Sequence, residues 1–352
     1  MNRIILLGNG FDLAHGLPTT YKDFVFNYIH GVVNKKEHDD NYITYVNNHM
    51  GVDFSNVKTI NEILDTMNKK AGIQYSFKNS FLNSALHNLS LNNWIDLEMH
   101  YYSNLKYYVD WDKRQIKNEG NIKSFNDSFE SVKVLLEDYL SQKVVPQISN
   151  FASAYFIDIF NKKINFDEFG KSEHTGHENP KISLFLNFNY TNTIQHYIGE
   201  IQGEKIILNI HGELNNPNNP LIFGFGDELD EKYHEIENLN SNELFRHLKS
   251  FMYMQTSNYH RLVRFIESGE FEVFIIGHSC GLSDRTMLNY IFEHDNCKSI
   301  KIYYYKDKAN FIATTHEISR HFKKDKNEMR IKIVPFDKSQ ICPQSEMIDR
   351  KQ

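Results

Sequence analysis

The sequence has few cysteines, no excess of positive charge and no long apolar run. The three cysteines, Cys280, Cys297 and Cys342, are too few and too widely spaced for a disulfide framework or a Cys-rich zinc site, so no metal is predicted. Lys and Arg number 39 against 45 Asp and Glu, a net charge of −6, which leaves no global positive field to gather nucleic acid or anionic lipid. No apolar run approaches the roughly 20 residues of a membrane span, and residues 4–7 are too short for the core of a secretory signal. We therefore expect a soluble, cytoplasmic protein with no membrane partner and no evident nucleic-acid partner, and the net charge leaves a local basic groove open.

Apolar and aromatic residues, in contrast, are plentiful. Hydrophobic residues make up 40% and aromatic residues 14% of the chain, with 20 tyrosines and 26 phenylalanines. This composition excludes a disordered polar chain. A chain of 352 residues can bury a sizeable core, either as one lobe with a substantial insertion or as two lobes.

Short apolar runs alternate with segments of helical spacing at both ends of the sequence. The first run, residues 3–7, precedes a helical segment for which Thr19 or Thr20 offers the N-cap. Five later runs predict strands: residues 182–188, 205–211, 272–278, 299–305 and 329–336. The segments between them predict helices: residues 243–267, 284–293 and 310–323. The alternation predicts an α/β fold, a Rossmann-like parallel sheet with helices on both faces.

The alternation is lost between residues 31 and 180. This segment is rich in Asn, Lys and Tyr, and its apolar residues recur at helical spacing. We expect a mostly helical insertion over residues 31–180, which interrupts a nucleotide-binding lobe made of residues 1–30 and 181–352. In such a sheet ligands bind beyond the carboxyl ends of the strands, so the residues that follow each strand are the candidate site residues.

Two glycines, Gly8 and Gly10, follow the first strand. They fit either a tight structural turn or a loop whose backbone N–H groups approach a phosphate. The full dinucleotide fingerprint is not met, because its third glycine position is Leu13 and no acidic second strand lies about 20 residues further on.

Polar residues follow the next strands. Asn189 could hold a ribose hydroxyl or a water, or simply form a turn. His211, beside Gly212, suits general base catalysis, although one histidine among 17 can equally be structural. Residues 224–227, Gly-Phe-Gly-Asp, fit either a flexible lid or a surface turn.

Residues 277–281 read Gly-His-Ser-Cys-Gly, the spacing of the nucleophile elbow in α/β-hydrolases. In that interpretation Ser279 is the nucleophile, and Asp307 with His316 or His321 completes a triad. Both histidines fall in a predicted helix rather than in a late loop. The hydrolase interpretation also leaves the glycine turn and the polar residues after the earlier strands unused, so it ranks second.

Five segments together resemble the bacteriophage abortive-infection AbiH family along nearly the whole chain. They are residues 4–28, 188–192 (FNYTN), 211–214 (HGEL), 223–228 (FGFGDE) and 275–284 (IIGHSCGLSD). The same landmarks are similar to the broader sirtuin-like superfamily, whose members bind NAD in a Rossmann-type lobe interrupted by a smaller inserted module.

The sirtuin-like resemblance implies a function and a set of site residues. The implied activity is hydrolysis of the nicotinamide–ribose bond, with NAD as the substrate, no metal, and depletion of NAD in a phage-infected cell as the outcome. Asn189 would hold a ribose hydroxyl or the attacking water, and His211 would be the general base. The implied nucleotide contacts are Gly8, Asn9 and Gly10 at the pyrophosphate, Asp12 near the nicotinamide ribose, Thr19 in the same loop, and Gly277, His278, Ser279 and Asp284 on the adenosine side.

Two positions depart from the sirtuin-like pattern. Asp12 stands where a serine is usual, one position past Phe11, and Thr191 stands where an aspartate is expected. An anion lost at the ribose site leaves open a protein that senses NAD or a related adenine nucleotide without cleaving it.

Control of the activity is expected because unregulated NAD hydrolysis would be lethal. We therefore predict a homo-oligomer, a phage-derived trigger, or both. The aromatic residues of the insertion, such as Tyr101, Tyr102 and Tyr107, are either a surface for assembly or part of its core.

Overall fold

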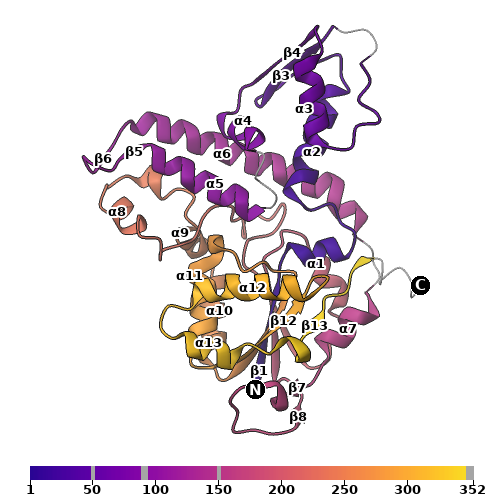
Figure 1. Cartoon of the computed structure of the whole chain (residues 1–352), viewed down its shortest axis with the longest axis vertical. Helices are drawn as coiled ribbons and strands as arrows, with labels where there is room; N and C mark the ends of the chain where they lie inside the picture. The colour runs from indigo at the N-terminus through magenta and orange to yellow at the C-terminus, as the bar shows by residue number, and fades with distance from the viewer. Residues whose placement is uncertain (49–51, 89–93, 149–151, 346–352) are drawn as a thin grey trace. The chain divides into compact units, whose positions relative to one another are not determined.

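The computed structural model describes residues 1–48, 52–88, 94–148 and 152–345 (Figure 1). They form two compact units, each made of separate stretches of chain. The first unit comprises residues 1–17, 140–238 and 247 onward, and the second comprises residues 18–139 and 239–246. The sequence-based division lay after residue 30 and after residue 180, so residues 18–30, 140–180 and 239–246 belong to the other unit from the one expected.

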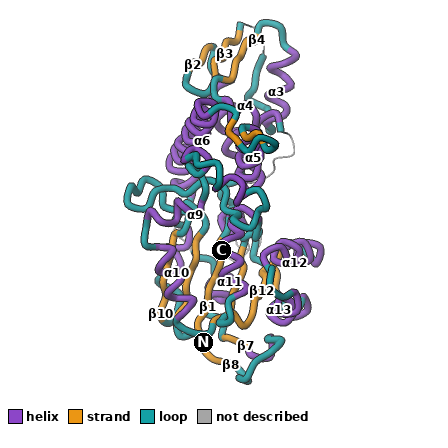
Figure 2. Tube along the Cα trace, turned by 90° about the vertical axis from the view of Figure 1, so that its left-hand side faces the viewer, coloured by secondary structure: helices purple, strands orange, loops and turns teal. Residues whose placement is uncertain are grey.

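A six-stranded parallel sheet forms the middle of the first unit, in the order β10-β9-β1-β11-β12-β13. The strands are β1 (Asn2–Leu7), β9 (Ile182–Asn187), β10 (Glu204–Asn209), β11 (Phe271–Ile276), β12 (Cys297–Tyr304) and β13 (Gln340–Ile341). Figure 2 shows β10, β1 and β12 following one another across the sheet. Leu7 of β1 pairs in register with Asn187 on one side and Ile276 on the other, and Asn187 pairs with Asn209. The carboxyl ends of these four strands therefore reach the same edge.

Side chains alternate along each strand, so both faces of this sheet carry apolar residues, and helices cover both faces. The covering helices are α1 (Asn9–Ala14), α7 (Ala154–Phe160), α10 (Asn258–Glu267), α11 (Arg285–Glu293) and α12 (Lys308–His321). Ile4 and Leu6 belong to a buried cluster with residues of α10, α11 and α12. Ile5 and Leu7 belong to a second cluster, with residues of α1 and α7. The predicted class, a Rossmann-like α/β sheet with helices on both faces, is confirmed.

One predicted strand, residues 329–336, is wrong. Its first half, residues 329–332, belongs to α13 (Lys326–Lys332). This helix begins after Asp325, whose carboxylate accepts a hydrogen bond from the backbone N–H of Asn327. Met329 and Ile333, four residues apart, both pack against the core. The apolar spacing is therefore that of a helix face, and the sixth strand of the sheet is β13.

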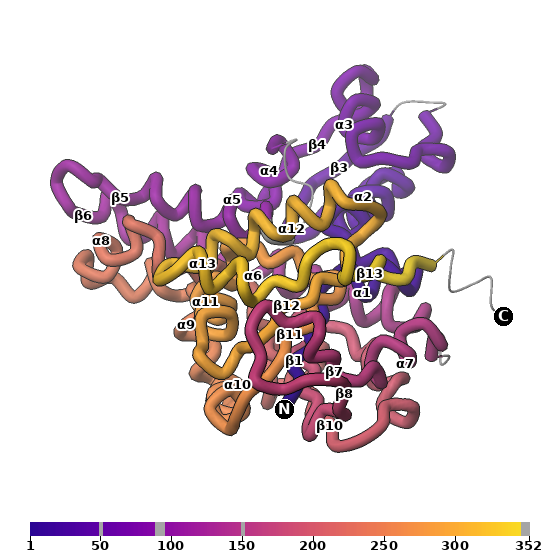
Figure 3. The backbone as a smooth tube through the Cα atoms, turned by 60° about the horizontal axis from the view of Figure 1, so that its bottom comes forward, coloured from indigo at the N-terminus to yellow at the C-terminus, as the bar shows by residue number. Residues whose placement is uncertain are grey.

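Shorter elements complete the first unit. The predicted helix over residues 243–267 is interrupted, since α9 (Lys249–Met252) ends well before α10 begins, and α8 (Tyr233–Glu237) precedes both. The strands β7 (Ile164–Asn165) and β8 (His177–Glu178) pair antiparallel. Figure 3 shows this pair next to the amino-terminal end of β1, where Met1 packs against Ile164.

The second unit combines helices with small antiparallel sheets. Its helices are α2 (Tyr21–Val33), α3 (Ile60–Lys69), α4 (Ser80–His87), α5 (Trp94–Tyr107) and α6 (Glu119–Tyr139). Its strands are β2 (Glu37–Asp39), β3 (Ile43–Asn47), β4 (Ile73–Phe77), β5 (Val109–Asp110) and β6 (Gln115–Ile116). Thr20 caps α2, and its hydroxyl accepts from the backbone N–H of Asp23, as a capping box requires.

The aromatic residues of the second unit are divided between core and surface. Tyr101 and Tyr102 are buried, and the ring of Tyr101 stacks on that of Phe129 at 4.1 Å between centroids. Tyr107 is 74% exposed. Tyr101 and Tyr102 are therefore core residues and form no assembly surface. Among the residues with described positions, no helix combines the length and the apolar character that crossing a membrane requires.

Candidate functional site

The carboxyl edge of the sheet brings the loops after β1, β9, β10 and β11 together. Gly8, Asn189, His211 and Gly277 lie directly after these strands or within two residues of their ends. Because the strands are parallel and in register, segments that are distant in the sequence meet at this edge. The candidate site is built from these four loops and from residues 224–227 and 247–253, all within the first unit.

A buried hydrogen bond joins His211 to Asp284. Nε2 of His211 lies 3.0 Å from Oδ1 of Asp284 and 3.2 Å from the hydroxyl oxygen of Tyr253. All three residues are buried. Asp284 directly precedes α11, and its carboxylate makes no capping hydrogen bond to that helix. The sirtuin-like resemblance implied an adenosine contact for Asp284, whereas the structure places it on the predicted general base.

Two further basic side chains surround the Asp284 carboxylate. Nζ of Lys249, a residue only 1% exposed, donates to Oδ1 of Asp284 at 2.9 Å. Nε2 of His278 lies 3.7 Å from Oδ2 of Asp284. We call His211, Lys249, His278 and Asp284 the charge cluster. Within the part of the chain that the structure describes, no group of three or more His, Cys, Asp or Glu side chains could hold a metal ion.

Three members of the charge cluster, His211, His278 and Asp284, have shifted pKa values, and burial and neighbouring charges cause the shifts. Burial lowers the pKa of His211, and the nearby Lys249 ammonium lowers it further, against the opposing effect of Asp284. Burial also lowers the pKa of His278 to about 4. Burial alone would raise the pKa of Asp284, but Lys249 and His211 hold it well below its usual range. At neutral pH the cluster therefore contains an ionised Asp284 and two neutral imidazoles.

Residues 224–227 position Lys249 and are not an exposed lid. They are buried, and Phe225 forms an isolated parallel bridge with Leu248. The backbone N–H of Phe225 donates to the carbonyl of His247, and the N–H of Lys249 donates to the carbonyl of Phe225. A Cβ on Gly224 would lie 2.0 Å from the His247 carbonyl oxygen, so only glycine permits this approach. The lid and surface-turn interpretations of this segment are both wrong.

The glycines after β1 allow the end of β1 to lie very close to the loop that follows β11. A Cβ on Gly8 would lie 2.5 Å from Cα of His278, and one on Gly10 would lie 2.7 Å from Cα of Gly277. The N–H of Gly8 donates to the carbonyl of Ile276, and the N–H of Gly10 donates to that of Gly277. These two N–H groups are committed to β11 and its loop, so the structure corrects their predicted role as pyrophosphate donors. Asn9 is the first residue of α1.

The amide of Asn189 ties the loop after β9 to the end of β1. Its Nδ2 donates to the carbonyl of Gly8 at 3.1 Å, and the residue is 7% exposed. Asn187, the last residue of β9, donates through its own Nδ2 to the carbonyls of Asn189 and Thr191. Asn189 therefore lies at the predicted edge of the sheet, with the nitrogen of its side-chain amide bonded to a backbone carbonyl.

The two residues that depart from the sirtuin-like pattern contact each other. Oγ1 of Thr191 donates to Oδ2 of Asp12 at 2.6 Å, and Oγ1 of Thr193 donates to Oδ1 of Asp12 at 2.8 Å. Asp12 is 1% exposed, and this burial raises its pKa to about 6. The site therefore keeps one buried carboxylate paired with a hydroxyl at this point.

The hydrolase triad does not assemble. Ser279 is exposed, while Nε2 of His321 contacts the carbonyl oxygen of Cys280 at 2.7 Å. Asp307 caps α12 by accepting from the backbone N–H of Asn310. The left-handed residues of this turn are Gly277 and Cys280, with φ of 66° and 54°, not the serine. The nucleophile-elbow geometry is absent from these described residues, which argues against the α/β-hydrolase alternative.

Two residues of the candidate site, Lys249 and Tyr253, were not predicted from the sequence, and one predicted residue, Thr19, lies elsewhere. Lys249 and Tyr253 have no sequence motif that announces them, although the glycines at 224 and 226 indicate that something must approach closely there. Thr19 is buried and belongs to the second unit, whereas the candidate site lies within the first.

A cavity of about 350 Å³ opens beside the site, at the carboxyl ends of β9 and β10. Most of its lining residues have polar, uncharged side chains. They are Ser141, Val145, Tyr190, Thr191, Asn192, Gln195, Asn209, Glu213, Leu214 and Asn215. We call it the amide pocket. The ring of Tyr190 lies 6.4 Å from that of His211 between centroids, so the pocket adjoins the predicted general base.

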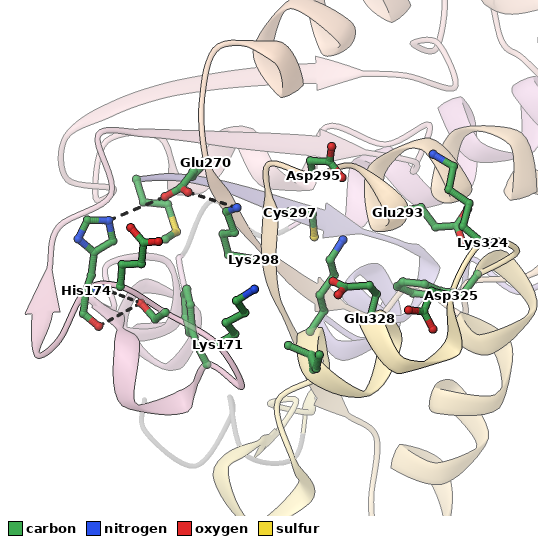
Figure 4. A pocket seen from close by; sticks show the side chains of 17 residues that line it. Lys171, His174, Glu270, Glu293, Asp295, Cys297, Lys298, Lys324, Asp325 and Glu328 are labelled. Carbon is green, nitrogen blue, oxygen red and sulfur yellow. Dashed lines mark hydrogen bonds and ion pairs between the residues drawn. The ribbon is translucent and has the colours of Figure 1, made fainter.

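A second cavity, of about 320 Å³, lies at the opposite edge of the sheet, near Met1 and the start of β12 (Figure 4). Lysines and carboxylates from several loops line it, and some pair with each other. Glu270, for example, lies 3.2 Å from Nζ of Lys298 and 3.9 Å from Nε2 of His174. It contains none of the predicted site residues and is far from the carboxyl edge in the register of the strands.

Comparison with known proteins gives one match. The family model described as "Bacteriophage abortive infection AbiH" matches residues 4–306. Comparisons with curated proteins and with solved structures yield no significant match. The matched range runs from β1 to beyond β12 and includes every residue of the charge cluster.

Proposed function

The chain belongs to the AbiH family of bacteriophage abortive-infection proteins, and from that membership and the charge cluster we propose that it defends the cell by hydrolysing NAD. Family membership supports the defence role. The observation that carries the enzymatic part is the buried His211–Asp284 hydrogen bond at the carboxyl edge of the sheet. A neutral imidazole oriented by a carboxylate is suited to take a proton from water.

The proposed reaction breaks the bond between the nicotinamide nitrogen and C1′ of the ribose. The bonding electron pair leaves with nicotinamide, which is cationic in NAD and neutral after release, so no general acid is needed. Water attacks C1′, its proton passes to the base, and the second product is ADP-ribose. The transition state resembles an oxocarbenium ion and carries its positive charge on the ribose.

His211 is the proposed base. Asp284 orients the ring through Nε2 and stabilises the imidazolium that forms when the ring takes the proton. The lowered pKa of His211, due to burial and then to Lys249, keeps the imidazole neutral and ready to accept the proton. A positioned base of this kind contributes roughly 10²–10⁴-fold to a rate.

The Asp12–Thr191 pair supports the ribose end of the proposal. Asp12 lies in α1, which follows β1, and its two partners lie in the segment that follows β9. A buried carboxylate at this position favours positive charge nearby, which is the charge that develops on the ribose. We propose that Asp12 supplies the anion for which the pattern uses the residue at position 191.

A second candidate, nucleotide sensing without turnover, is favoured by one observation. The N–H groups of Gly8 and Gly10 and the Nδ2 group of Asn189 all donate to backbone carbonyls of the protein. A site whose donors are already engaged can bind a ligand through fewer contacts, and its helical partner unit would then carry the response. Tight binding of ADP-ribose without nicotinamide release would favour this candidate. For either candidate we propose control by self-assembly or by a phage-derived trigger.

The proposal is tested by measuring NAD in infected cells. Cells that express the wild-type protein should lose most of their NAD after phage infection, and cells that express His211→Asn should keep it. His316→Asn is the matched control, because His316 is exposed on α12 and outside the site. Loss of NAD that is equal in wild type and His211→Asn would contradict the proposal.

A further inference from the structure

The cavity at the amino-terminal edge of the sheet shares no residue with the charge cluster (Figure 4). Cys297, which lines it, is the first residue of β12 and pairs in register with Phe271, the first residue of β11. The cavity has a volume of about 320 Å³, near the lower end of the range of small-molecule sites, about 300–1,000 Å³. We call it the amino-edge cavity. Its size suits a small metabolite.

Two segments that are far apart in the sequence form opposite walls of the amino-edge cavity. Residues 169–174 line one side, and residues 324–332 line the other (Figure 4). The two segments touch at Gly170, where a Cβ would lie 2.4 Å from the carbonyl oxygen of Ile331. Only glycine permits this approach, so direct backbone contact fixes the distance between the walls at this point.

A buried lysine gives the deep part of the cavity a positive charge. Lys332 is 6% exposed, and its Nζ donates to the carbonyls of Phe292 and His294, each at 3.0 Å. An ammonium group has three hydrogens, so one remains for a ligand. No carboxylate among the residues that the structure describes forms an ion pair with Lys332. The neighbouring thiol of Cys297 is neutral, because burial raises its pKa to about 12. An ammonium group in this setting favours an anionic group of a ligand.

Glu328 stands one helical turn before Lys332 on α13. Side chains four residues apart lie on the same face of a helix, with about 5–6 Å between their Cβ atoms. Both residues line the cavity, Glu328 from its exposed part and Lys332 from its buried part. No ion pair joins these two described side chains. A carboxylate and an ammonium group that are close but unpaired match a ligand whose own two charges are equally close, as in a free α-amino acid.

The charge of the whole lining disfavours a ligand with charge of only one sign. Six carboxylates and four lysines line the cavity, an excess of negative charge that repels a pure anion, whereas Lys332 repels a pure cation. Some carboxylates are already engaged: Oε1 of Glu293 accepts from the backbone N–H groups of Lys323 at 2.6 Å and Lys324 at 2.7 Å. The side chain of Glu328 has no hydrogen bond within the described ranges and stays available to a ligand. A zwitterion meets both conditions.

Apolar side chains complete the lining. Phe322 is 1% exposed, and Met1, Phe169 and Ile331 also border the cavity. Aromatic rings bury a large apolar area and pack favourably against one another. The cavity therefore offers an apolar surface beside the two charges of α13.

We propose that the amino-edge cavity binds a free α-amino acid with an apolar side chain. The ligand carboxylate accepts from Lys332, the ligand ammonium group donates to Glu328, and the ligand side chain packs against Phe322. This binding site goes beyond the proposed hydrolysis of NAD and does not depend on it.

The test is calorimetric binding of three probes to the purified full-length protein. L-Phenylalanine carries both charges, L-phenylalaninamide lacks the carboxylate, and N-acetyl-L-phenylalanine lacks the ammonium group. The amide should bind more weakly than L-phenylalanine by roughly tenfold or more, because Lys332 is buried. The acetyl form should bind more weakly by roughly threefold or more, because water screens the exposed Glu328.

The two capped probes also imitate the ends of a peptide. The amide resembles the first residue of a peptide, and the acetyl form resembles the last. Tighter binding of either capped form would show that the cavity captures a peptide end and would overturn the proposal. Equal affinities for all three probes, or no binding of L-phenylalanine, would overturn it as well.

Two variants assign the contacts. Glu328→Gln should weaken binding of L-phenylalanine by roughly threefold or more and leave binding of the acetyl form unchanged, because that probe has no ammonium group. Lys332→Met should remove the preference for L-phenylalanine over its amide. Glu204→Gln, at an exposed carboxylate outside the cavity, is the control and should change no affinity.

Glu328→Gln decides the matter even if Lys332→Met does not fold, because Glu328 is exposed and its side chain supports no contact of the described fold. Unchanged binding of L-phenylalanine to Glu328→Gln, or an equal loss for L-phenylalanine and its acetyl form, would contradict the proposal.

Discussion

Asp12 and Thr191 are 179 positions apart in the sequence and are joined by a hydrogen bond of 2.6 Å. Each occupies a position where the sirtuin-like pattern has the other kind of side chain: a carboxylate stands in place of a hydroxyl at 12, and a hydroxyl in place of a carboxylate at 191. The two departures, which as separate changes indicated a lost anion, are therefore neighbours in space, as the proposed exchange of their roles requires. Thr193 also donates to Asp12, so this one carboxylate has two hydroxyl partners.

This exchange predicts that the pair can be swapped. Thr191→Asp alone places two buried carboxylates together, and Asp12→Thr alone removes the acceptor for Thr191 and Thr193. Each single variant should lose stability, by about 1–3 kcal/mol or more. The double variant Asp12→Thr, Thr191→Asp should be more stable than the sum of the single effects by at least about 1 kcal/mol, as measured by urea unfolding. Additive losses would show that the two side chains do not act as a pair.

The buried Asp12 also predicts a pH dependence of stability. Burial raises its pKa in the folded state to about 6 from 3.8. The folded protein therefore binds this proton more tightly than the unfolded chain, and the contribution of Asp12 to stability falls as the pH rises from about 4 to 6. Asp12→Asn removes the titration. Its unfolding free energy relative to wild type should rise with pH over this range, by up to roughly 3 kcal/mol at about 1.4 kcal/mol per pKa unit. A constant difference between pH 4.5 and 7 would contradict the assignment.

Lys249 is predicted to keep His211 neutral. The groups that face His211 and its partner are Lys249, Asp284, His278, Tyr253 and the backbone of Phe188. Lys249 lowers the pKa of His211, while Asp284 and the Phe188 backbone raise it. Lys249→Met removes the opposing cation, so the pKa of His211 should rise, whereas Lys249→Arg should leave it near the wild-type value. The measurement is NMR titration of the labelled His211 ring, which requires no catalytic activity. An unshifted titration in a folded Lys249→Met protein would show that Lys249 has only a structural role.

The glycines at the carboxyl edge are predicted to matter for folding without any ligand. Gly10→Ala would place a methyl group 2.7 Å from Cα of Gly277, a backbone atom that cannot move aside. We expect a loss of about 1–3 kcal/mol in the unfolding free energy of the ligand-free protein. Gly199→Ala is the control, because a Cβ there meets nothing within 4 Å. If Gly10→Ala has normal stability and impairs only nucleotide binding, the glycine serves the ligand after all.

The sequence was informative where local pattern decides structure. Five of the six predicted strands and the Thr20 cap follow from apolar alternation and from the preference for hydroxyl side chains at helix starts, and both are local. The strand predicted over residues 329–336 was wrong because alternating apolar residues over a short run fit either a strand or one face of a helix. Asp325 as a cap decided between them.

The charge cluster could be predicted only in part. His211 and Asp284 follow strands or begin helices, where site residues are expected, but their contact depends on the parallel register of β10 and β11 across the sheet. The position of Lys249 beside Asp284 depends on the isolated β-bridge between Phe225 and Leu248, which no periodicity in the sequence predicts. The same is true of the glycines at 8 and 10, whose reason lies in the loop after β11.

The central claim is that His211, oriented by Asp284, hydrolyses NAD, and the most direct measurement is nicotinamide release by the purified protein in its assembled or trigger-activated state. Wild-type protein should release nicotinamide and ADP-ribose in equal amounts. His211→Asn should be slower by roughly 10²–10⁴-fold, and His316→Asn should match the wild type. Intact NAD with activated wild-type protein, or equal rates for wild type and His211→Asn, would contradict the account.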